Sequence, residues 1–367
     1  MGIAEKIADI HAEMARTQKN KATEHHLGLL KAKLAKLRSQ LLEPESGSGG
    51  GKGEGFAVSK SGDARVSLIG FPSVGKSTIL TKLTETESVS AEYAFTTLTA
   101  IPGNIHYKGA KLQLLDTPGI IEGAAQGRGR GKQVIAITRT ADLVLMMLDA
   151  SKGEVQKELL EYELESVGIR LNKSPPDITF KRKKGGGVSF NATVPLTRID
   201  ERMVKGVCQE YKIHHCEILV RCDATIDEMI DVIEGNRVYL PCLYVYNKID
   251  TITIEMVDDI ARRPNTIVIS CEMALNLEYL LEKIWEYLDL IRVYTKPASG
   301  DPKFDEPLVI RRGSTVREVC RGIHRDFEQQ FKNAFVWGTS AKHTPQRVGI
   351  GHVLEDEDVI QLIRKPA

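Results

Sequence analysis

Residues 70–78, with the sequence GFPSVGKST, constrain the fold of this chain more than any other segment. They match the pattern G-x-x-x-x-G-K-[ST], which requires a buried strand before it and a helix after it. The apolar run RVSLIG at residues 65–70 meets the first requirement. In such a loop, glycines let backbone N–H groups surround phosphates, and the start of the helix favours their negative charge. The segment therefore predicts a phosphate-binding loop in an α/β domain, lined by Pro72, Ser73, Val74, Gly75, Lys76, Ser77 and Thr78.

A second motif, DTPG at residues 116–119, follows the apolar run LQLLD. The carboxylate of Asp116 can hold magnesium through water, and the backbone N–H of Gly119 can contact a γ phosphate. In the first motif, Lys76 reaches the β and γ phosphates and Ser77 binds magnesium. We therefore expect Lys76 and Gly119 to serve catalysis, and Ser77 and Asp116 to hold the metal.

A segment that senses the γ phosphate is expected between these motifs, and YAFTTLTAIPG at residues 93–103 fits it. We expect Thr97 to serve catalysis as well, by completing the magnesium site and touching the γ phosphate, with Thr96 as the alternative. The other interpretation is that both threonines simply begin a strand, because Thr favours strands.

A third motif, NKID at residues 247–250, follows another apolar run. A carboxylate at Asp250 accepts hydrogen bonds from N1–H and the 2-amino group of guanine, which adenine cannot supply. Asn247 is expected to brace the neighbouring loops, and the stem of Lys248 to pack on the base. The three motifs in this order predict a GTP site.

The segment SCE at residues 270–272 falls where a further loop can offer a backbone N–H to O6 of guanine. We assign Ser270 and Cys271 to nucleotide binding on this basis. It is the least specific of the four segments.

Five apolar runs, most of them separated by helix-like segments, predict a mainly parallel sheet with helices on both faces. The runs are residues 65–70, 112–116, 142–149, 240–247 and 266–270. About ninety residues separate the third run from the fourth, where a single crossover needs roughly 12 to 30. We therefore expect an inserted α+β subdomain, with a basic strand pair turned at residues 185–187 and helices near residues 201–211 and 225–234. Beyond residue 290, extended segments around one helix at residues 316–331 predict a small mixed sheet.

Apolar residues recur at three- and four-residue steps in residues 3–14 and 27–41, which predicts a helical hairpin that turns at residues 19–23. Between residues 16 and 38 the hairpin carries basic residues at seven positions and one acid, Glu24. This basic surface could contact RNA or could simply be a solvated face. The glycine-rich run at residues 46–55 predicts a flexible linker, so that the hairpin would be tethered rather than rigidly fused. The expected division is residues 1–45 for the hairpin, 46–63 for the linker, 64–168 and 238–290 for the nucleotide domain, 169–237 for the insert and 291–367 for the C-terminal domain.

The chain carries 50 Lys and Arg against 49 Asp and Glu, so a nucleic-acid surface must come from local clusters. Its six cysteines form no C-x-x-C pair, which favours reduced thiols in the cytosol. No apolar run approaches the roughly 20 residues that span a bilayer, and the first residues lack a signal-peptide pattern. These features predict a cytoplasmic protein with no membrane segment.

The whole chain resembles the developmentally regulated GTP-binding proteins, the DRG/RBG branch of the Obg-related, translation-factor-class GTPases. The resemblance rests on HHLGLLKAKLAKLR, GFPSVGKST, FTTL, PGIIEGA with GRGRGKQVIA, GIRLNKSPPDI, DVIEGNRVY, NKID, IRVYTKP and LEDEDVIQ. It implies a helix-turn-helix N-terminus, a P-loop GTPase domain interrupted by an S5D2-like insert, and a C-terminal TGS domain with a β-grasp fold. Two positions depart from the family pattern. Thr117 stands where the branch usually has Leu, and Cys271–Glu272 stand where Ser-Ala is the commoner beginning.

The resemblance also implies a partner and a role. Such proteins associate with translating ribosomes and ribosomal RNA, are stabilised by a DRG family regulatory protein, and act as GTP-driven switches that help slow elongation. The chain is then expected to be a monomer or a heterodimer with that partner. The alternative is a cytoskeletal or scaffold protein whose binding is gated by GTP. A small-molecule kinase is the weakest alternative, because the NKID motif is not expected in such an enzyme.

Ile120 stands where many related loops place a glutamine that orients the attacking water. Its side chain has no hydrogen-bonding group, so intrinsic hydrolysis is expected to be slow. Relatives hold a potassium ion with an Asn at the position of Ser73, which makes potassium stimulation one hypothesis. The second is that Arg128, Arg130 and Lys132 on the glycine-rich arm meet ribosomal RNA or a partner that orders the site. The third is a merely solvated loop.

Overall fold

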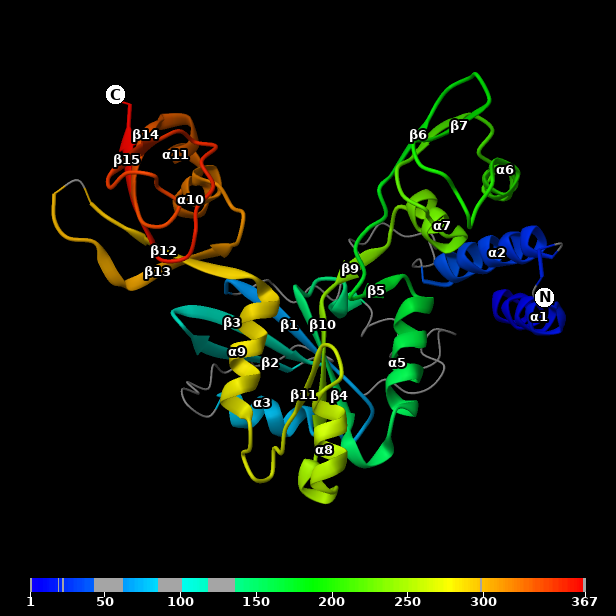
Figure 1. Ribbon diagram of the computed structural model, residues 1–367, viewed down its shortest axis with the longest axis horizontal. Helices are drawn as coiled ribbons and strands as arrows, with labels where there is room; N and C mark the ends of the chain where they lie inside the picture. The colour runs from blue at the N-terminus through cyan, green and yellow to red at the C-terminus, as the bar shows by residue number, and fades with distance from the viewer. Residues whose placement is uncertain are drawn as a thin grey trace, which may run out of the picture.

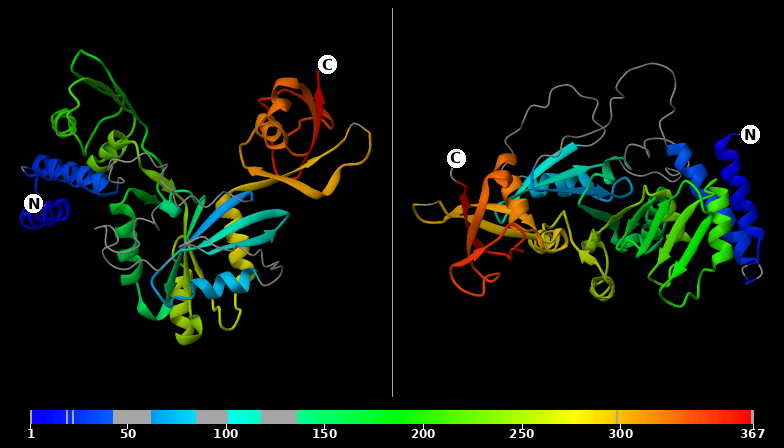
Figure 2. Two further views of the ribbon diagram at one scale, coloured as in Figure 1. Left: turned by 180° about the vertical axis from the view of Figure 1, so that it is seen from behind. Right: turned by 90° about the horizontal axis from the view of Figure 1, so that it is seen from above.

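The computed structural model describes residues 2–18, 20–21, 23–42, 62–84, 101–117, 136–297 and 299–365. A central domain carries the insert and the N-terminal hairpin on one side and the C-terminal domain on the other (Figure 1). The view from behind and the view from above show the same separation of the two flanks (Figure 2). In the described part of the chain, no helix is both long and apolar enough to cross a membrane.

The central domain is built on a six-stranded sheet with the order β11-β10-β4-β1-β3-β2. Its strands are β1 (Ala64–Ile69), β2 (Ile101–Tyr107), β3 (Ala110–Asp116), β4 (Leu143–Asp149), β10 (Cys242–Asn247) and β11 (Thr266–Val268). All neighbours are parallel except β2, which pairs antiparallel with β3 at the edge. The predicted parallel sheet is therefore confirmed. Every residue of β1 and β4 is buried, as expected for strands covered on both faces.

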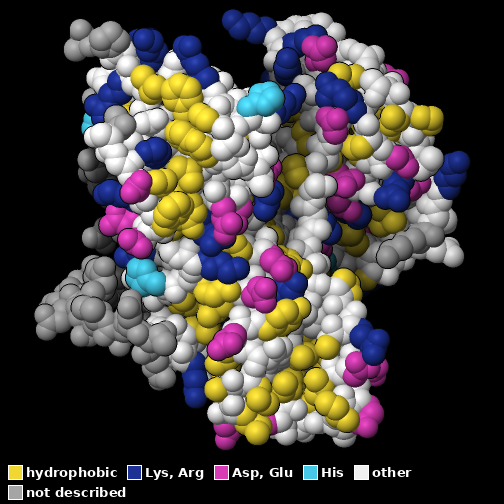
Figure 3. Space-filling view, turned by 60° about the vertical axis from the view of Figure 1, so that its left-hand side comes forward, with side chains coloured by type: hydrophobic (Ala, Val, Ile, Leu, Met, Phe, Trp, Pro, Cys, Tyr) yellow, Lys and Arg dark blue, Asp and Glu magenta, His cyan; other side chains and the backbone are white. Residues whose placement is uncertain are grey.

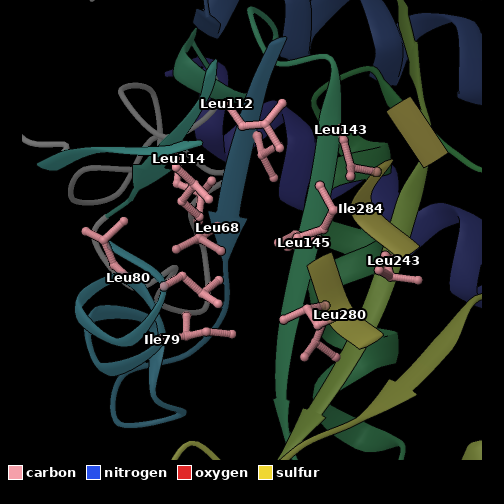
Figure 4. Packing of buried hydrophobic residues seen from close by; sticks show 14 of the residues in the cluster. Leu68, Ile79, Leu80, Leu112, Leu114, Leu143, Leu145, Leu243, Leu280 and Ile284 are labelled. Atoms are coloured by element: carbon pink, nitrogen blue, oxygen red, sulfur yellow. The ribbon is translucent and has the colours of Figure 1, made fainter. Parts of the chain in front are cut away.

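Helices cover both faces of this sheet. They are α3 (Lys76–Thr84), α5 (Val155–Ser166), α8 (Ile254–Ala261) and α9 (Leu277–Leu288), with the short helices η2 (Ala150–Lys152) and η3 (Ile249–Thr251). One core lies between the sheet and helices α3 and α9, where Leu68 and Leu145 meet Ile79, Leu280 and Ile284 (Figure 4). A second core joins the other face to α5 and α8. Each fully buried Leu or Ile contributes roughly 1.5–3 kcal/mol to folding, so these cores hold the strand ends in place.

The insert has its own sheet, and its strand order differs from the expectation. Strands β6 (Ile178–Arg182) and β7 (Val188–Ala192), predicted to pair with each other, instead flank β8 (Cys216–Val220), giving the order β6-β8-β7. The reason is that β8 alternates buried and half-buried residues and so supplies the apolar central strand. Helices α6 (Glu201–Glu210) and α7 (Ile226–Glu234) confirm the two predicted helices and pack on one face.

Two short parallel strands connect the insert to the central domain. They are β5 (Ile169–Leu171) on the way out and β9 (Val238–Leu240) on the way back. Asp231 of α7 links the two connecting segments. It accepts hydrogen bonds from Arg170 Nε and Nη2 at 2.7 Å and from Arg237 Nε at 3.0 Å. Burial lowers the pKa of Arg170, but the Asp231 carboxylate outweighs this and the pKa lies above its ordinary value.

The N-terminal hairpin consists of α1 (Ile3–Arg16) and α2 (Glu24–Leu42), as predicted. It is not loosely tethered, however, because α2 is docked on the insert. Ala32 is fully buried within the core of the insert, and its carbonyl accepts a hydrogen bond from Tyr211 Oη at 3.3 Å. Gly28 of α2 and Gly206 of α6 also lie at this crossing. Small side chains let the helices approach closely, which is how the hairpin becomes part of the insert.

The C-terminal domain is a five-stranded mixed sheet with the order β13-β12-β16-β14-β15. Its elements are β12 (Leu290–Thr295), β13 (Lys303–Arg311), α10 (Val316–Ile323), α11 (Arg325–Gln330), β14 (Phe331–Trp337), β15 (Gln346–Val348) and β16 (Asp358–Arg364). The mixed sheet agrees with the prediction, but the expected single helix is divided in two. His324 has an extended backbone (φ −165°, ψ 143°) that ends α10 before α11 begins.

Candidate nucleotide-binding site

The predicted site residues gather at one edge of the central sheet, where its parallel strands end. β3 ends at Asp116, β4 at Asp149 and β10 at Asn247, and the phosphate loop leaves β1 at the same edge. This edge is the usual place for a ligand on an open parallel sheet.

The phosphate loop closes around Lys76, the first residue of α3. Lys76 is buried, and its Nζ donates to the carbonyls of Gly70 at 3.0 Å and Phe71 at 2.9 Å. The loop needs glycine at position 75, where φ is +100° and a Cβ would lie 2.3 Å from Asn247 Nδ2. Burial lowers the pKa of Lys76, while the nearby Asp116 carboxylate opposes that shift. The ammonium group is thus held in a poorly solvated place where an added phosphate would be a strong partner.

The Ser77 hydroxyl donates to Asp116 Oδ2 at 2.6 Å. Asp116 is buried, and its Oδ1 has no hydrogen-bond partner among the described residues. An unsatisfied carboxylate oxygen next to a hydroxyl suits a hard divalent cation that keeps several waters and phosphate oxygens. In the described ranges, no group of three or more His, Cys, Asp or Glu side chains that could hold a metal ion occurs. The residues present therefore fit magnesium.

Asn247 joins two loops. Its Nδ2 donates to the carbonyl of Val74 at 2.9 Å, and its Oδ1 accepts from the backbone N–H of Cys271, also at 2.9 Å. Asn247 therefore has the geometry of the predicted brace, and the two loops that it holds together are residues 70–78 and 270–272. The Cys271 thiol is buried, and burial raises its pKa to about 11. Cys271 therefore contributes to the site through its backbone N–H, which donates to Asn247, and not through a thiolate.

The carboxylate of Asp250 is oriented by the other loop. Its Oδ1 accepts from Ser270 Oγ at 2.5 Å, and Ser270 Oγ in turn accepts from Met273 N at 3.2 Å. Asp250 itself is exposed, as a base-binding carboxylate at the rim must be before a nucleotide arrives.

Asp149 is a site residue that the sequence analysis did not identify. Its Oδ2 accepts a hydrogen bond from Lys248 Nζ at 2.8 Å, and its Oδ1 accepts from Ser151 N and Oγ at 3.0 and 2.6 Å. Burial raises the pKa of Asp149, but these hydrogen bonds outweigh burial and leave the pKa below its ordinary value. Its place at the end of an apolar strand, which it shares with Asp116, marks the position in the sequence but not its partner Lys248.

The remaining predicted residues divide into two groups. Pro72, Ser73 and Thr78 lie on the exposed rim of the phosphate loop. Those outside the described residues are Thr96, Thr97, Gly119, Ile120, Arg128, Arg130 and Lys132.

Three family models match the chain. The model described as a 50S ribosome-binding GTPase matches residues 65–181, and the model of the C-terminal region of that domain matches residues 185–290. The TGS domain model matches residues 291–364.

The chain is 65% identical over 365 residues to the developmentally-regulated GTP-binding protein 2 homolog of Dictyostelium discoideum, with 100% of both chains covered. It is also 65% identical to developmentally-regulated GTP-binding protein 2 of Homo sapiens, again with full coverage of both. The chain belongs to the developmentally regulated GTP-binding protein family. As a member, it combines an Obg-type GTPase domain with a TGS domain, and the resemblance stated from the motifs is confirmed. The family is a GTP-binding family, which makes GTP the nucleotide for the site described above.

Proposed function

We propose that this protein is a ribosome-associated GTPase that binds and hydrolyses GTP as a switch in translation elongation. The observation that carries the proposal is the double hydrogen bond of Asn247, which locks the phosphate loop to the loop of residues 270–272. The loop that binds the phosphates and the loop that binds the base then form one hydrogen-bonded frame. Such a frame gives a change at the γ phosphate a route to the base-binding loops.

Each side chain has a distinct task in this proposal. Lys76 neutralises charge on the β and γ phosphates. Asp250 accepts from N1–H and the 2-amino group of guanine, with its carboxylate oriented by Ser270. Ser77 and Asp116, together with Thr97, would hold magnesium, which supplies charge neutralisation at the phosphates. Gly119 offers its backbone N–H to the γ phosphate.

Hydrolysis by the isolated protein is expected to be slow, because Ile120 cannot orient water. Phosphoryl transfer depends mainly on positioning and charge neutralisation, and one added cation contributes roughly 10³–10⁵ in rate. Two sources are proposed. One is a potassium ion near Ser73, and the other is ribosomal RNA or a partner that Arg128, Arg130 and Lys132 contact and that thereby completes the site.

The proposed partner is the cytoplasmic ribosome with its RNA. A DRG family regulatory protein is the proposed second partner. Support comes from the family description as ribosome-binding GTPases and from the TGS domain. The insert and the C-terminal domain stand on opposite flanks of the GTPase domain (Figure 1), so contacts at either flank can bear on the nucleotide site.

The test is the GTP hydrolysis rate of the purified protein in potassium buffer, titrated with eukaryotic ribosomes. We expect a clear rise that is lost in Lys76→Ala and is smaller when sodium replaces potassium. Equal rates in both salts would remove the potassium hypothesis alone. Absence of a rise with ribosomes, combined with GTP-dependent co-sedimentation on microtubules, would replace the proposal with the cytoskeletal alternative.

A further inference from the structure

The far end of the insert carries a dense group of cations that the nucleotide site does not use. Lys181, Arg182, Lys183 and Lys184 end β6 and begin the connection to β7, and all four are exposed. Lys212 is exposed on the neighbouring turn between α6 and β8. We call these five residues the basic tip. The β6–β7 connection forms the upper end of the insert in Figure 1, and Lys and Arg side chains stand at the top of both upper lobes in Figure 3.

The backbone of the basic tip is held in a fixed arrangement by hydrogen bonds between its two segments. Lys183 N donates to the carbonyl of His215 at 3.0 Å, and Gly187 N donates to His215 Nδ1, also at 3.0 Å. Cys216 N donates to the carbonyl of Gly187 at 3.1 Å. Because the two segments are joined on both sides of the turn, residues 181–184 are held against the segment that leads into β8 rather than on an independent loop.

The cations of the basic tip are largely uncommitted within the molecule. Lys183 pairs with Glu217 at 2.8 Å, and the hydrogen bond from Lys183 lowers the pKa of that carboxyl. Lys181, Arg182, Lys184 and Lys212 form no ion pair with the described part of the chain. Like charges kept this close repel one another, so an anionic partner would relieve the repulsion.

Three of the seven basic residues of the hairpin differ in this respect. Lys31 pairs with Asp227 at 2.5 Å, Lys36 donates to the carbonyl of Glu210 at 2.8 Å, and Arg38 donates to Tyr162 Oη at 3.2 Å. These three cations attach the hairpin to the insert and to α5. The hairpin is therefore the poorer candidate for binding an external anion.

We propose that the basic tip docks on the phosphate backbone of folded RNA. Successive side chains of a strand point to opposite sides, so Lys181 and Arg182 at the end of β6 spread their charges over both sides of the tip. That arrangement suits a continuous polyanion better than a single carboxylate. The inference deepens the proposed function, on which the identity of the RNA as ribosomal rests.

The test measures binding of the full-length protein to a 20-base-pair RNA duplex as a function of salt. The tip variant is Lys181→Gln, Arg182→Gln, Lys184→Gln and Lys212→Gln in one chain. Each phosphate contact removed lowers the magnitude of the slope of log K against log salt by about 1. We therefore expect a slope lower by roughly 3 to 4 and affinity at least about 10²-fold weaker near 0.1 M salt. Thermal melting checks that the variant is folded.

The matched control removes four exposed cations elsewhere, with Lys6, Lys33, Arg262 and Lys342 changed to Gln. It has the same net charge as the tip variant, and we expect a slope change of less than 1. An equal loss in both variants, or no loss in the tip variant, would overturn the proposal. Polyglutamate that competes as strongly as RNA at equal charge would replace RNA with an acidic protein. Ribosome-stimulated GTP hydrolysis is measured in parallel on the unaltered protein. Tip-dependent RNA binding without that stimulation would refute the proposed function and leave this inference standing.

Discussion

At the scale of single residues, the pair between Asp149 and Lys248 adds a polar contact to the guanine site. Lys248 begins the turn after β10 with a positive φ of 67°. Its ammonium group donates a hydrogen bond to the carboxylate of Asp149, the last residue of β4. The stem of the lysine is thereby fixed in the place where it can pack on the base. Asp149 is a positioning residue, since it acts through Lys248.

Asp149→Asn is expected to weaken GTP binding. The change removes one charge from a hydrogen bond that is worth about 1.5–3 kcal/mol when one partner is charged, which corresponds to roughly 10- to 100-fold in Kd. The measurement is nucleotide affinity in a double-mutant cycle with Lys248→Gln. Additive losses would show that the two side chains do not act together. Asp259→Asn, at an exposed position of α8, is the control and should leave the affinity unchanged.

Much of this site could be predicted because each motif lies next to a strand that its own residues define. Lys76, Asp116 and Asn247 all follow apolar runs, and parallel strands bring their ends together whatever lies between them. Asp149 was missed because its role depends on a lysine 99 residues away, which no local pattern contains. Interactions between strand ends are visible only once the strand order is known.

At the scale of elements, the packing of α2 on the insert differs from the predicted flexible tether. The predicted linker at residues 46–55 suggested a tether, but residues 28, 32 and 35 of α2 are Gly, Ala and Ala at helical spacing. That small-residue stripe was the available signal, and it faces α6 and α7. The strand order of the insert was missed for a related reason. Two strands joined by a short turn usually pair directly, and only the apolar β8, more than twenty residues later, displaces them.

Ala32→Glu is expected to release the hairpin from the insert. A glutamate at a fully buried position would place an unpaired charge among the side chains of α6 and α7, at a cost of several kcal/mol. Hydrogen exchange of α2 amides should then rise at least about 10-fold, while GTP affinity stays unchanged. Ala12→Glu on the exposed side of α1 is the matched control. Exchange that is equal in both variants would mean that the packing of α2 contributes little.

At the scale of the whole molecule, the insert is held to the GTPase domain by the ionic cluster of Arg170, Asp231 and Arg237. All three side chains are at most 15% exposed. Asp231→Asn leaves two buried guanidinium groups without their carboxylate, and breaking a buried pair costs about 3–5 kcal/mol. Thermal or urea unfolding measures this loss. Asp227→Asn breaks an exposed pair on the same helix and should cost no more than about 1 kcal/mol. Similar losses for the two variants would show that the cluster does not stabilise the connection.

We propose that the whole molecule responds to GTP because the frame around Asn247 and Asp250 selects guanine. The most direct measurement is the affinity of Asp250→Asn for GTP and for xanthosine triphosphate. An amide at this position can donate to the 2-oxo group of xanthine, whereas it cannot accept both guanine donors. We predict that GTP affinity falls by roughly 10²-fold or more while xanthosine triphosphate becomes the preferred nucleotide, and that Asp149→Asn keeps its preference for GTP. An Asp250→Asn protein that still prefers GTP would show that Asp250 does not select the base.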